Sequence, residues 1–267
     1  MIEVVITGGG SGLADEILEA LAPIEADFRV RLIDTLDAAG EARRFQGRTV
    51  LVELDTEAGL DSADVVLDLD ASYAGQIDRF RPEPPAVALL RRLFAELPSG
   101  HIDAMHGVIR EPAVSMANGV DALAAQVTQL FNGRDPEHGL FGGTLAFNSR
   151  ILDEASVCDA LATIPALDQA NVSIERVLSD SFYTVVASLW VQSSADAAIL
   201  SLTNTAFVAG EGVSPDSGRV DVDAPIRLTA RSASAGWVHL HVSADLERTL
   251  WAQDARDAVL RRLDRVL

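Results

Sequence analysis

The hydrophobic and polar positions of the first hundred residues alternate between short apolar runs and stretches with helical spacing. Ile17, Leu18 and Leu21 lie on one face of a predicted helix over residues 14–21, which follows a glycine-rich turn at residues 8–12. Apolar runs predict strands at residues 4–7, 27–34, 49–52 and 63–69. The last of these runs is apolar enough to be buried on both sides. Strands and helices that alternate with short connections are typical of a parallel, doubly wound α/β sheet.

A different pattern follows the proline-rich break at residues 81–85. The spacing predicts helices at residues 86–97, 113–131, around 158 and from 245 to 267, and strands at 105–110, 172–179, 183–192, 226–233 and 237–242. Along the last helix, Leu250, Ala258, Leu263 and Val266 are the predicted inward positions. Several neighbouring strands with helices between the groups predict a second, mixed α+β domain over residues 105–244, after a first domain over residues 1–104.

The charge of the chain excludes several kinds of function. The net charge is −19, and all 21 basic residues are arginine, so no lysine can form a Schiff base or bind phosphate in a P-loop. Such an acidic surface repels a phosphate backbone, which argues against nucleic acid as a partner. A halophilic or GC-rich source would equally explain a surface that is rich in acidic groups and has arginine as its only basic residue, so the charge is not by itself a sign of function.

Three further features bear on location. No apolar run approaches the length of a membrane span. The first residues carry no basic region and no cleavage signature, so we expect no export signal. The single cysteine, Cys158, excludes an internal disulfide and fits a reducing compartment. The sequence therefore predicts a cytoplasmic protein without a membrane partner.

The order of strand, glycine turn and helix is the context that a dinucleotide-binding site requires. Gly8, Gly10 and Gly12 would let the backbone approach a pyrophosphate at the helix N-terminus, and Asp34 could hold a ribose hydroxyl, which favours NAD over NADP. Against this, the glycine spacing is not a clean G-x-G-x-x-G, and Asp15 places a carboxylate where phosphate would lie. Two interpretations stay open: an NAD site, or a tight turn that binds no cofactor.

Residues 126–148, with the sequence QVTQLFNGRDPEHGLFGGTLAFN, resemble the aspartate-semialdehyde dehydrogenase family, and most closely its Usg-type branch. Residues 7–21 are similar to the family's G-A-T-G-x-V-G turn and helix, and Phe182-Tyr183 to an aromatic pair before its histidine. The strand at residues 238–245 looks like the one that ends in A-D-N. The resemblance implies a Rossmann-like domain, a mixed α+β dimerisation domain and a homodimer formed by the second domain's sheet and long helix.

The same resemblance implies that the family's chemistry is lost. The family uses a cysteine thioester, a histidine that moves the proton, and NADP. The cysteine position falls on Pro84, the histidine on Val185 and the A-D-N asparagine on Leu246. The glutamine motif falls near residues 114–118, which hold no glutamine, and the basic residue for the NADP phosphate becomes Thr35. We therefore expect no catalytic residues of the family type.

The family pattern is also shortened between Asp70 and Pro82, which leaves few helices to cover the second face of the first sheet. In the family, the chain returns to its nucleotide domain after the A-D-N strand. We therefore expect the helix at residues 245–267 to complete the first domain, because a parallel sheet needs cover for its apolar side chains.

Other residues offer weaker candidates for a site. Cys158 has Asp159 beside it, which would raise the pKa of a thiol, so we expect a small, partly buried helix residue rather than a nucleophile. His239 and His241 share one face of a strand and could chelate a metal, but no third ligand with suitable spacing is evident. A polar or interface-facing sheet surface explains the two histidines better, so we expect no metal.

Asp68 and Asp70 lie at the carboxyl edge of the first sheet, where open α/β folds bind ligands, although an acidic loop also explains them. The sequence as a whole predicts a non-catalytic, dimeric homologue of aspartate-semialdehyde dehydrogenase that acts as a structural or protein-interaction component. The alternative is an NAD(P)-binding oxidoreductase or nucleotide sensor whose site is not built from the family's catalytic residues.

Overall fold

The computed structural model of the chain describes residues 2–55, 60, 62–71, 79–153, 155–193, 208–209, 226–233 and 236–265. The chain divides into two compact units, a first unit of residues 1–83 and 250–267 and a second unit of residues 84–249. The sequence-based division had assigned residues 84–104 to the first domain, whereas the structure places them in the second unit. None of the helices in the described part of the chain combines the length and hydrophobicity needed to span a bilayer.

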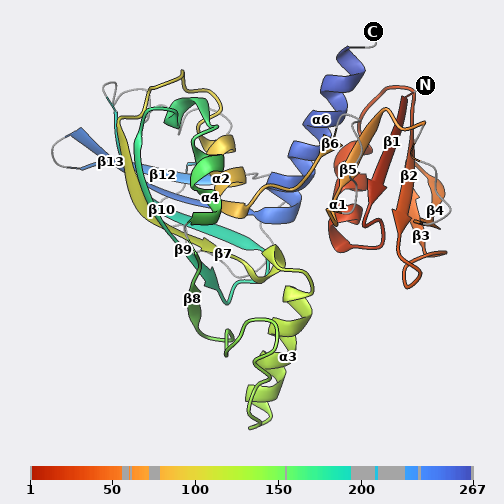
Figure 1. The fold of residues 1–267 in the computed structure, drawn as a ribbon, viewed down its shortest axis with the longest axis horizontal. Helices are drawn as coiled ribbons and strands as arrows, with labels where there is room; N and C mark the ends of the chain where they lie inside the picture. Colours follow the sequence, from red (N-terminus) through yellow and green to blue (C-terminus); the bar gives the residue numbers. More distant parts are fainter. Residues whose placement is uncertain are drawn as a thin grey trace. The chain divides into compact units, whose positions relative to one another are not determined.

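Six strands form the sheet of the first unit, in the order β3-β4-β2-β1-β5-β6 (Figure 1). They are β1 Ile2–Thr7, β2 Phe28–Asp34, β3 Ala42–Phe45, β4 Arg48–Leu54, β5 Val65–Asp68 and β6 Arg79–Phe80. All neighbouring strands run parallel except β3 and β4, which confirms the predicted α/β class of this unit. The strand order reverses between β1 and β5, which is where open α/β sheets bind ligands.

Two helices, α1 (Gly12–Leu21) and α6 (Ala252–Asp264), lie on one face of this sheet (Figure 1). α6 packs against α1 and β5, and its buried residues Ala255, Val259 and Leu263 form the inward stripe. Of the predicted inward positions, Leu250 and Leu263 are buried and Ala258 is half-buried. Val266 lies outside the described residues.

The described part of the opposite face of the sheet carries a small apolar cluster. Val5, Ile33, Val66 and Ala63 are buried together there, with the partly buried Leu60 packed against them. A parallel sheet with helices on both faces would bury a continuous apolar surface on each. Here the apolar part of this face ends within a few residues, and charged side chains occupy the rest.

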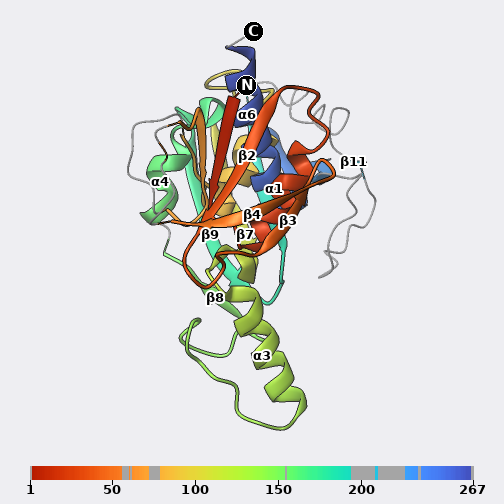
Figure 2. The ribbon, with the colours of Figure 1, turned by 90° about the vertical axis from the view of Figure 1, so that its right-hand side faces the viewer.

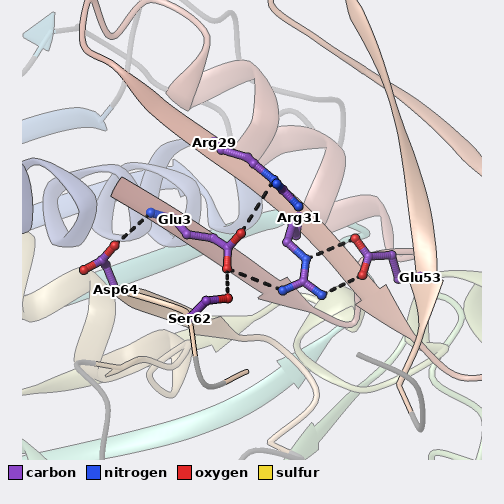
Figure 3. A network of polar contacts seen from close by, with 6 residues as sticks. All are labelled: Glu3, Arg29, Arg31, Glu53, Ser62 and Asp64. Atoms are coloured by element: carbon purple, nitrogen blue, oxygen red, sulfur yellow. Dashed lines mark hydrogen bonds and ion pairs between the residues drawn. The ribbon is translucent and has the colours of Figure 1, made fainter. Parts of the chain in front are cut away.

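An ion-pair network crosses three strands on this face (Figure 3). The Arg31 guanidinium on β2 donates Nε to Glu53 Oε1 at 3.1 Å and Nη2 to Glu53 Oε2 at 2.6 Å. Its Nη1 lies 3.4 Å from Oε2 of Glu3 on β1, and Arg29 Nε lies 3.5 Å from the other oxygen of Glu3. Ser62 Oγ donates a hydrogen bond to the same carboxylate. Charge-assisted bonds of this bidentate kind are the stronger ones in proteins.

Two carboxylates of the network, those of Glu53 and Asp64, have lowered pKa values. The hydrogen bonds from Arg31 hold the pKa of Glu53 below its ordinary value, with the positive charges of Arg31 and Arg29 acting in the same direction. The Glu3 backbone N–H donates to Asp64 Oδ2 at 3.0 Å and is the main reason that the pKa of Asp64 is lowered. The face is thus covered by charged groups that have partners, and it does not need a helix over it.

A seven-stranded sheet forms the second unit, in the order β11-β12-β13-β10-β7-β9-β8. The strands are β7 Ala104–Glu111, β8 Ser149–Ile151, β9 Asn171–Ser179, β10 Thr184–Gln192, β11 Val208–Ala209, β12 Ile226–Ser232 and β13 Trp237–Asp245. The helices are α2 Pro85–Leu93, α3 Gly119–Phe131 and α4 Ala155–Leu161, with a π-helix at Leu246–Trp251. Parallel and antiparallel pairs occur together, which confirms the predicted mixed sheet.

The two faces of this sheet differ in character. Met105, Ile109 and Leu189 point to one face and are almost completely buried, on the side where α2 packs against β7 and α4 (Figure 1). Alternation along the strands places His106 and Trp190 on the other face. His106 is exposed and Trp190 keeps 37% of its surface exposed, so no described helix covers this second face.

α3 and the loop that follows it extend away from the sheet of the second unit (Figure 2). The buried side chain of Gln126 fixes this loop to the helix, since it uses all four of its hydrogen-bonding positions. Its Nε2 donates to the carbonyl oxygens of Glu137 and Gly143, and its Oε1 accepts from the backbone N–H groups of Leu145 and Ala146. The segment that resembles a known family is therefore a helix-and-loop arm in which the Gln126 amide joins the loop to the helix.

This helix begins later than the sequence predicts. Residues 113–115 form a single 3₁₀ turn, and Asn118 has a left-handed backbone conformation with φ of 61°. A Cβ at Gly119 would lie 1.8 Å from the carbonyl oxygen of Ala113, so only glycine fits where the chain turns into α3. The prediction of one continuous helix over residues 113–131 is wrong because this turn interrupts it.

Candidate functional site

The glycine turn lies between β1 and α1 in the first unit, as the sequence predicts. Ser11 caps α1: its Oγ accepts from the Ala14 N–H at 3.3 Å and donates to the Gly8 carbonyl at 2.7 Å. Asp34, at the end of β2, turns its carboxylate toward the turn. Its Oδ2 accepts from the Gly10 N–H at 2.8 Å, and its Oδ1 accepts from the Thr35 N–H at 2.6 Å. The structure therefore brings Gly8, Gly10 and Asp34 together.

Contacts within the protein account for the small residues of this turn. A Cβ at Gly9 would lie 2.8 Å from Cβ of Leu32, and one at Gly10 would lie 2.4 Å from Cβ of Ala38. Gly12 is different, because nothing lies within 4 Å of the position that its Cβ would take. The chain itself, and not a ligand, requires glycine at two positions of the turn.

The charges around the turn fit a dinucleotide poorly. A pyrophosphate bound at a helix N-terminus needs free backbone N–H groups and no neighbouring anion. Here the Gly10 N–H already donates to the Asp34 carboxylate, which adds negative charge beside the turn. Arg43, the nearby cation, lies 2.9 Å from Asp15 and 2.8 Å from Glu41, and it donates to the Gly10 carbonyl at 2.9 Å. Its charge is thus neutralised by the protein's own carboxylates.

Asp68 and Asp70 meet at the point where the strand order reverses. Thr7 Oγ1 lies 2.8 Å from Asp70 Oδ1 and 3.2 Å from Asp68 Oδ1. Asp68 is fully buried, and Arg81 donates to its Oδ2 through Nε at 3.2 Å and Nη2 at 2.6 Å. This cluster ties the ends of β1 and β5 to the chain after β6, which is a structural role for the candidate pair.

The positions that the family resemblance assigns to catalysis hold apolar side chains, of which Pro84 is exposed and the other two are buried. Pro84 occupies the cap of α2, where no side chain accepts a helix N–H. Val185 is fully buried within β10 and pairs with Ala244 of β13. Leu246 is also fully buried, and its N–H donates to the carbonyl of Tyr183 at 3.0 Å. None of these three side chains can attack a carbonyl group or move a proton.

Cys158 lies on α4, and its exposure differs from the prediction. Its neighbour Val157 faces inward with 2% of its surface exposed, so the next position along the helix faces outward. The thiol is therefore exposed, and the predicted partly buried cysteine is wrong. Asp159 beside it is exposed as well, so the cysteine is not in a built pocket.

His239 and His241 do share one face of β13, and they join a larger cluster on the open face of the second sheet. The ring of His239 stacks on Trp190 with centroids 4.5 Å apart, and His106 stacks on the same indole at 5.6 Å. Trp237 meets His106 edge-on at 4.7 Å. We use the name Trp190 face for the open face of the sheet, which carries His106, Trp190, Trp237, His239 and His241. Stacked and edge-on rings of this kind stabilise a sheet surface beyond their buried area.

Hydrogen bonding and burial set the state of these histidines. Ser188 Oγ lies 2.9 Å from His239 Nε2. Burial lowers the pKa of His239 below its ordinary value, and the nearby charges of His241 and Arg231 add to this effect. Burial also lowers the pKa of His241. In the described part of the chain, no three His, Cys, Asp or Glu side chains are arranged to hold a metal ion.

The structure also shows a buried ion pair that sequence reasoning missed. Arg176 on β9 donates Nε to Glu111 Oε1 at 2.6 Å and Nη2 to Glu111 Oε2 at 3.0 Å, with both side chains nearly inaccessible. Arg176 Nη1 also donates to the carbonyl of Asp153 at 3.1 Å. The two strands pair in parallel, but Glu111 and Arg176 are 65 positions apart in the chain, so no local pattern could have joined them.

Comparisons with known proteins connect this fold to one enzyme family. Neither the models of protein families nor the sequences of curated proteins match the chain. A probable aspartate-semialdehyde dehydrogenase from Pseudomonas aeruginosa has a similar structure, with a TM-score of 0.81, 16% identity, and coverage of 100% of this chain and 99% of that one. Aspartate semialdehyde dehydrogenase II from Vibrio cholerae also has a similar structure, with a TM-score of 0.78, 18% identity, and coverage of 99% of this chain and 98% of that one.

A more distant match is the aspartate semialdehyde dehydrogenase from Candida albicans, solved with NADP, at a TM-score of 0.60, 10% identity, and coverage of 99% and 98%. Identities this low establish the fold and no more. Over its full length, the chain therefore has the fold of the aspartate-semialdehyde dehydrogenases.

Proposed function

We propose that the chain is a non-catalytic homologue of aspartate-semialdehyde dehydrogenase, of the Usg type, that works as a homodimeric interaction component in the cytoplasm. One observation carries the proposal: the positions that the resemblance assigns to the nucleophile, the proton-transfer residue and the cofactor contact hold Pro84, Val185 and Leu246. Two of these are fully buried and the third caps a helix. A thioester mechanism without a thiol and a base cannot run.

The purified protein should not reduce NADP in the presence of aspartate semialdehyde and phosphate. Replacing Pro84 by cysteine should not create activity, because a thiol there would still have no histidine at position 185 to move its proton. The measurement is NADPH absorbance against a control without enzyme and against an authentic dehydrogenase. Phosphate-dependent turnover above the control would remove the proposal.

The second part of the proposal is that two copies of the chain pair through the Trp190 face. Aromatic residues are enriched in interface cores, and large exposed aromatic groups on an ordered sheet mark interaction surfaces. The face also differs in charge from the whole chain, whose net charge is −19. By alternation, the described part of this face carries Arg110, Arg227 and Arg231 and one exposed carboxylate, Glu175, so it lacks the excess of acidic groups that the chain has as a whole.

The arrangement of the strands makes this face complementary to itself. β12 and β9 lie two strands away from β10 on opposite sides, and β13 and β7 lie one strand away. Suppose that the sheets of two chains stack through this face, with a two-fold axis between them that runs parallel to β10. This axis would place β12 of one chain over β9 of its partner. Arg227 and Arg231 would then come within reach of the partner's Glu175, and Trp190 would face its own copy.

The alternative is that the first unit still binds NAD or NADP. It is favoured by the position of the glycine turn at the reversal of strand order and by the open space at Gly12. The residues that would take part are Gly8, Gly10, Gly12 and Asp34. The chain could then act as a nucleotide sensor or as an oxidoreductase with a different catalytic site.

Thermal unfolding with and without millimolar NAD or NADP separates the two proposals. A ligand that binds only the native state must raise the melting temperature, so an intact site would give a clear rise. We expect no shift, because Asp34 already occupies the Gly10 N–H. The nucleotide sensor would be favoured instead if NAD or NADP raised the melting temperature of the unmodified chain and of the control variant Gly133→Ala, on the loop after α3, but not that of Gly12→Val.

A further inference from the structure

The Trp190 face concentrates histidines in an unusual way. The chain has five histidines, and three of them, His106, His239 and His241, lie on this one face. Two of them sandwich Trp190 from neighbouring strands, with interplanar angles of 6° and 25°. In the described residues, neither of the remaining histidines, His101 and His138, lies on a strand of this sheet.

We infer that the dimer proposed above is proton-sensitive, because protonation of His239 and His241 charges the Trp190 face and separates the two chains. The inference rests on the proposed homodimer. Under the two-fold arrangement, His239 of one chain faces the partner's His106 across the interface, so each added proton meets another imidazole. Like charges at such a contact cost affinity, and an interface core tolerates a charge only when it has a partner.

The charged groups around the histidines do not offset such protons. On β12, next to His239 and His241, stand Arg227 and Arg231, and on β7 stands Arg110. Glu175, on β9, is the one exposed carboxylate on the described part of this face. Asp245, at the end of β13, is buried and accepts the Arg248 N–H at 2.9 Å. The face is therefore already positive before any histidine is protonated.

The state of the histidines in the single chain points the same way. The pKa values of His239 and His241 lie below the ordinary histidine range because both rings are partly buried. They are thus neutral at neutral pH, when the rings can stack and be covered. Covering them further in a dimer lowers those pKa values again, so the dimer binds fewer protons than two separate chains. By linkage, association is strongest above the histidine pKa range and weakens as the pH falls through it.

Sedimentation or light scattering of the full chain at about pH 8 and about pH 5 tests this inference. The dissociation constant of the dimer should rise by at least about tenfold from pH 8 to pH 5. If one histidine must release its proton when the dimer forms, the constant rises by a factor of about ten for each pH unit below the pKa of that histidine. The triple variant His106→Gln/His239→Gln/His241→Gln should lose this dependence. The matched control His138→Gln, in the loop after α3, should keep it.

The outcomes separate the inference from the proposed dimer. A monomer at pH 8 removes the dimer and the inference together. A dimer with the same dissociation constant at both pH values, or a triple variant that still dissociates in acid, removes only the proton sensitivity. If the triple variant does not fold, titration calorimetry of the unmodified dimer on dilution, in buffers with different ionisation enthalpies, decides. Proton uptake on dissociation supports the inference, and heat that is independent of the buffer overturns it.

Discussion

Replacing Glu111 by alanine should lower the free energy of unfolding by about 3–5 kcal/mol, because it removes the buried carboxylate that accepts two hydrogen bonds from the guanidinium of Arg176. The Arg176 side chain is only 9% exposed and that of Glu111 only 2%, so water cannot take the place of the lost carboxylate. The pair also joins the neighbouring strands β7 and β9 of the second unit's sheet. The loss should therefore appear as a lower urea midpoint.

Two variants show whether the cause is the loss of this buried ion pair. The double replacement Glu111→Leu with Arg176→Met should recover most of the lost stability, since apolar residues of similar volume can replace a buried ion pair. Glu175→Ala, at an exposed position beside Arg176 on the same strand, should change the unfolding free energy by no more than about 0.5 kcal/mol. Urea titrations followed by tryptophan fluorescence measure all three. Equal stability of Glu111→Ala and the unmodified chain would show that the pair contributes nothing.

The first unit could be predicted well because its elements are local. The apolar run of β1, the glycine turn and the spacing of Ile17, Leu18 and Leu21 all indicate the same strand, turn and helix. β3 was not predicted, since its four residues Ala42–Phe45 include two arginines and only its pairing with β4 makes it a strand.

In the second unit, helix 113–131 was predicted too long because the left-handed Asn118 cannot be recognised from its residue type alone.

The candidate site depended more on tertiary contacts, and the sequence was less informative there. The spacing of His239 and His241 predicted a shared face, but His106 joins them only through the pairing of β7 with β10. The rotation of the Asp34 carboxylate onto the Gly10 N–H also has no sequence signal, although it changes what the turn can bind. The exposure of Cys158 was predicted wrongly because free cysteine is usually buried, whereas this one lies on the outer side of α4.

The ion-pair network on the first sheet lies on the face opposite to α1 and α6. Glu3, Arg31 and Glu53 lie on the face that a helix would otherwise cover. Replacing apolar residues there by paired charges removes the apolar surface that would need burial. The opposite face has no such substitute: its strands are apolar, and only α1 and α6 cover it among the described elements. The stability of the first unit therefore depends on α6.

The variant Val259→Asp should unfold the first unit while leaving the second unit folded. Val259 is fully buried on the inward side of α6, between Ala255 and Leu263, so an aspartate there would be a charge without a partner, at a cost of about 3–5 kcal/mol. Arg261→Asp introduces the same residue two positions along the helix, on its exposed side, and should be tolerated.

Hydrogen exchange measures the effect separately in each unit. In Val259→Asp, the amides of β1 at Val4 and Ile6, which are fully buried in the unmodified chain, should exchange at least about a hundredfold faster. The amide of Leu189 on β10 should keep its protection. Removing residues 245–267 should also expose β1, but it deletes the π-helix of residues 246–251 as well, so the point variant is the cleaner test. Unchanged protection at Val4 and Ile6 would mean that α6 does not complete the first sheet, whereas equal loss in both variants would assign the effect to added charge on α6 and not to the buried contact of Val259.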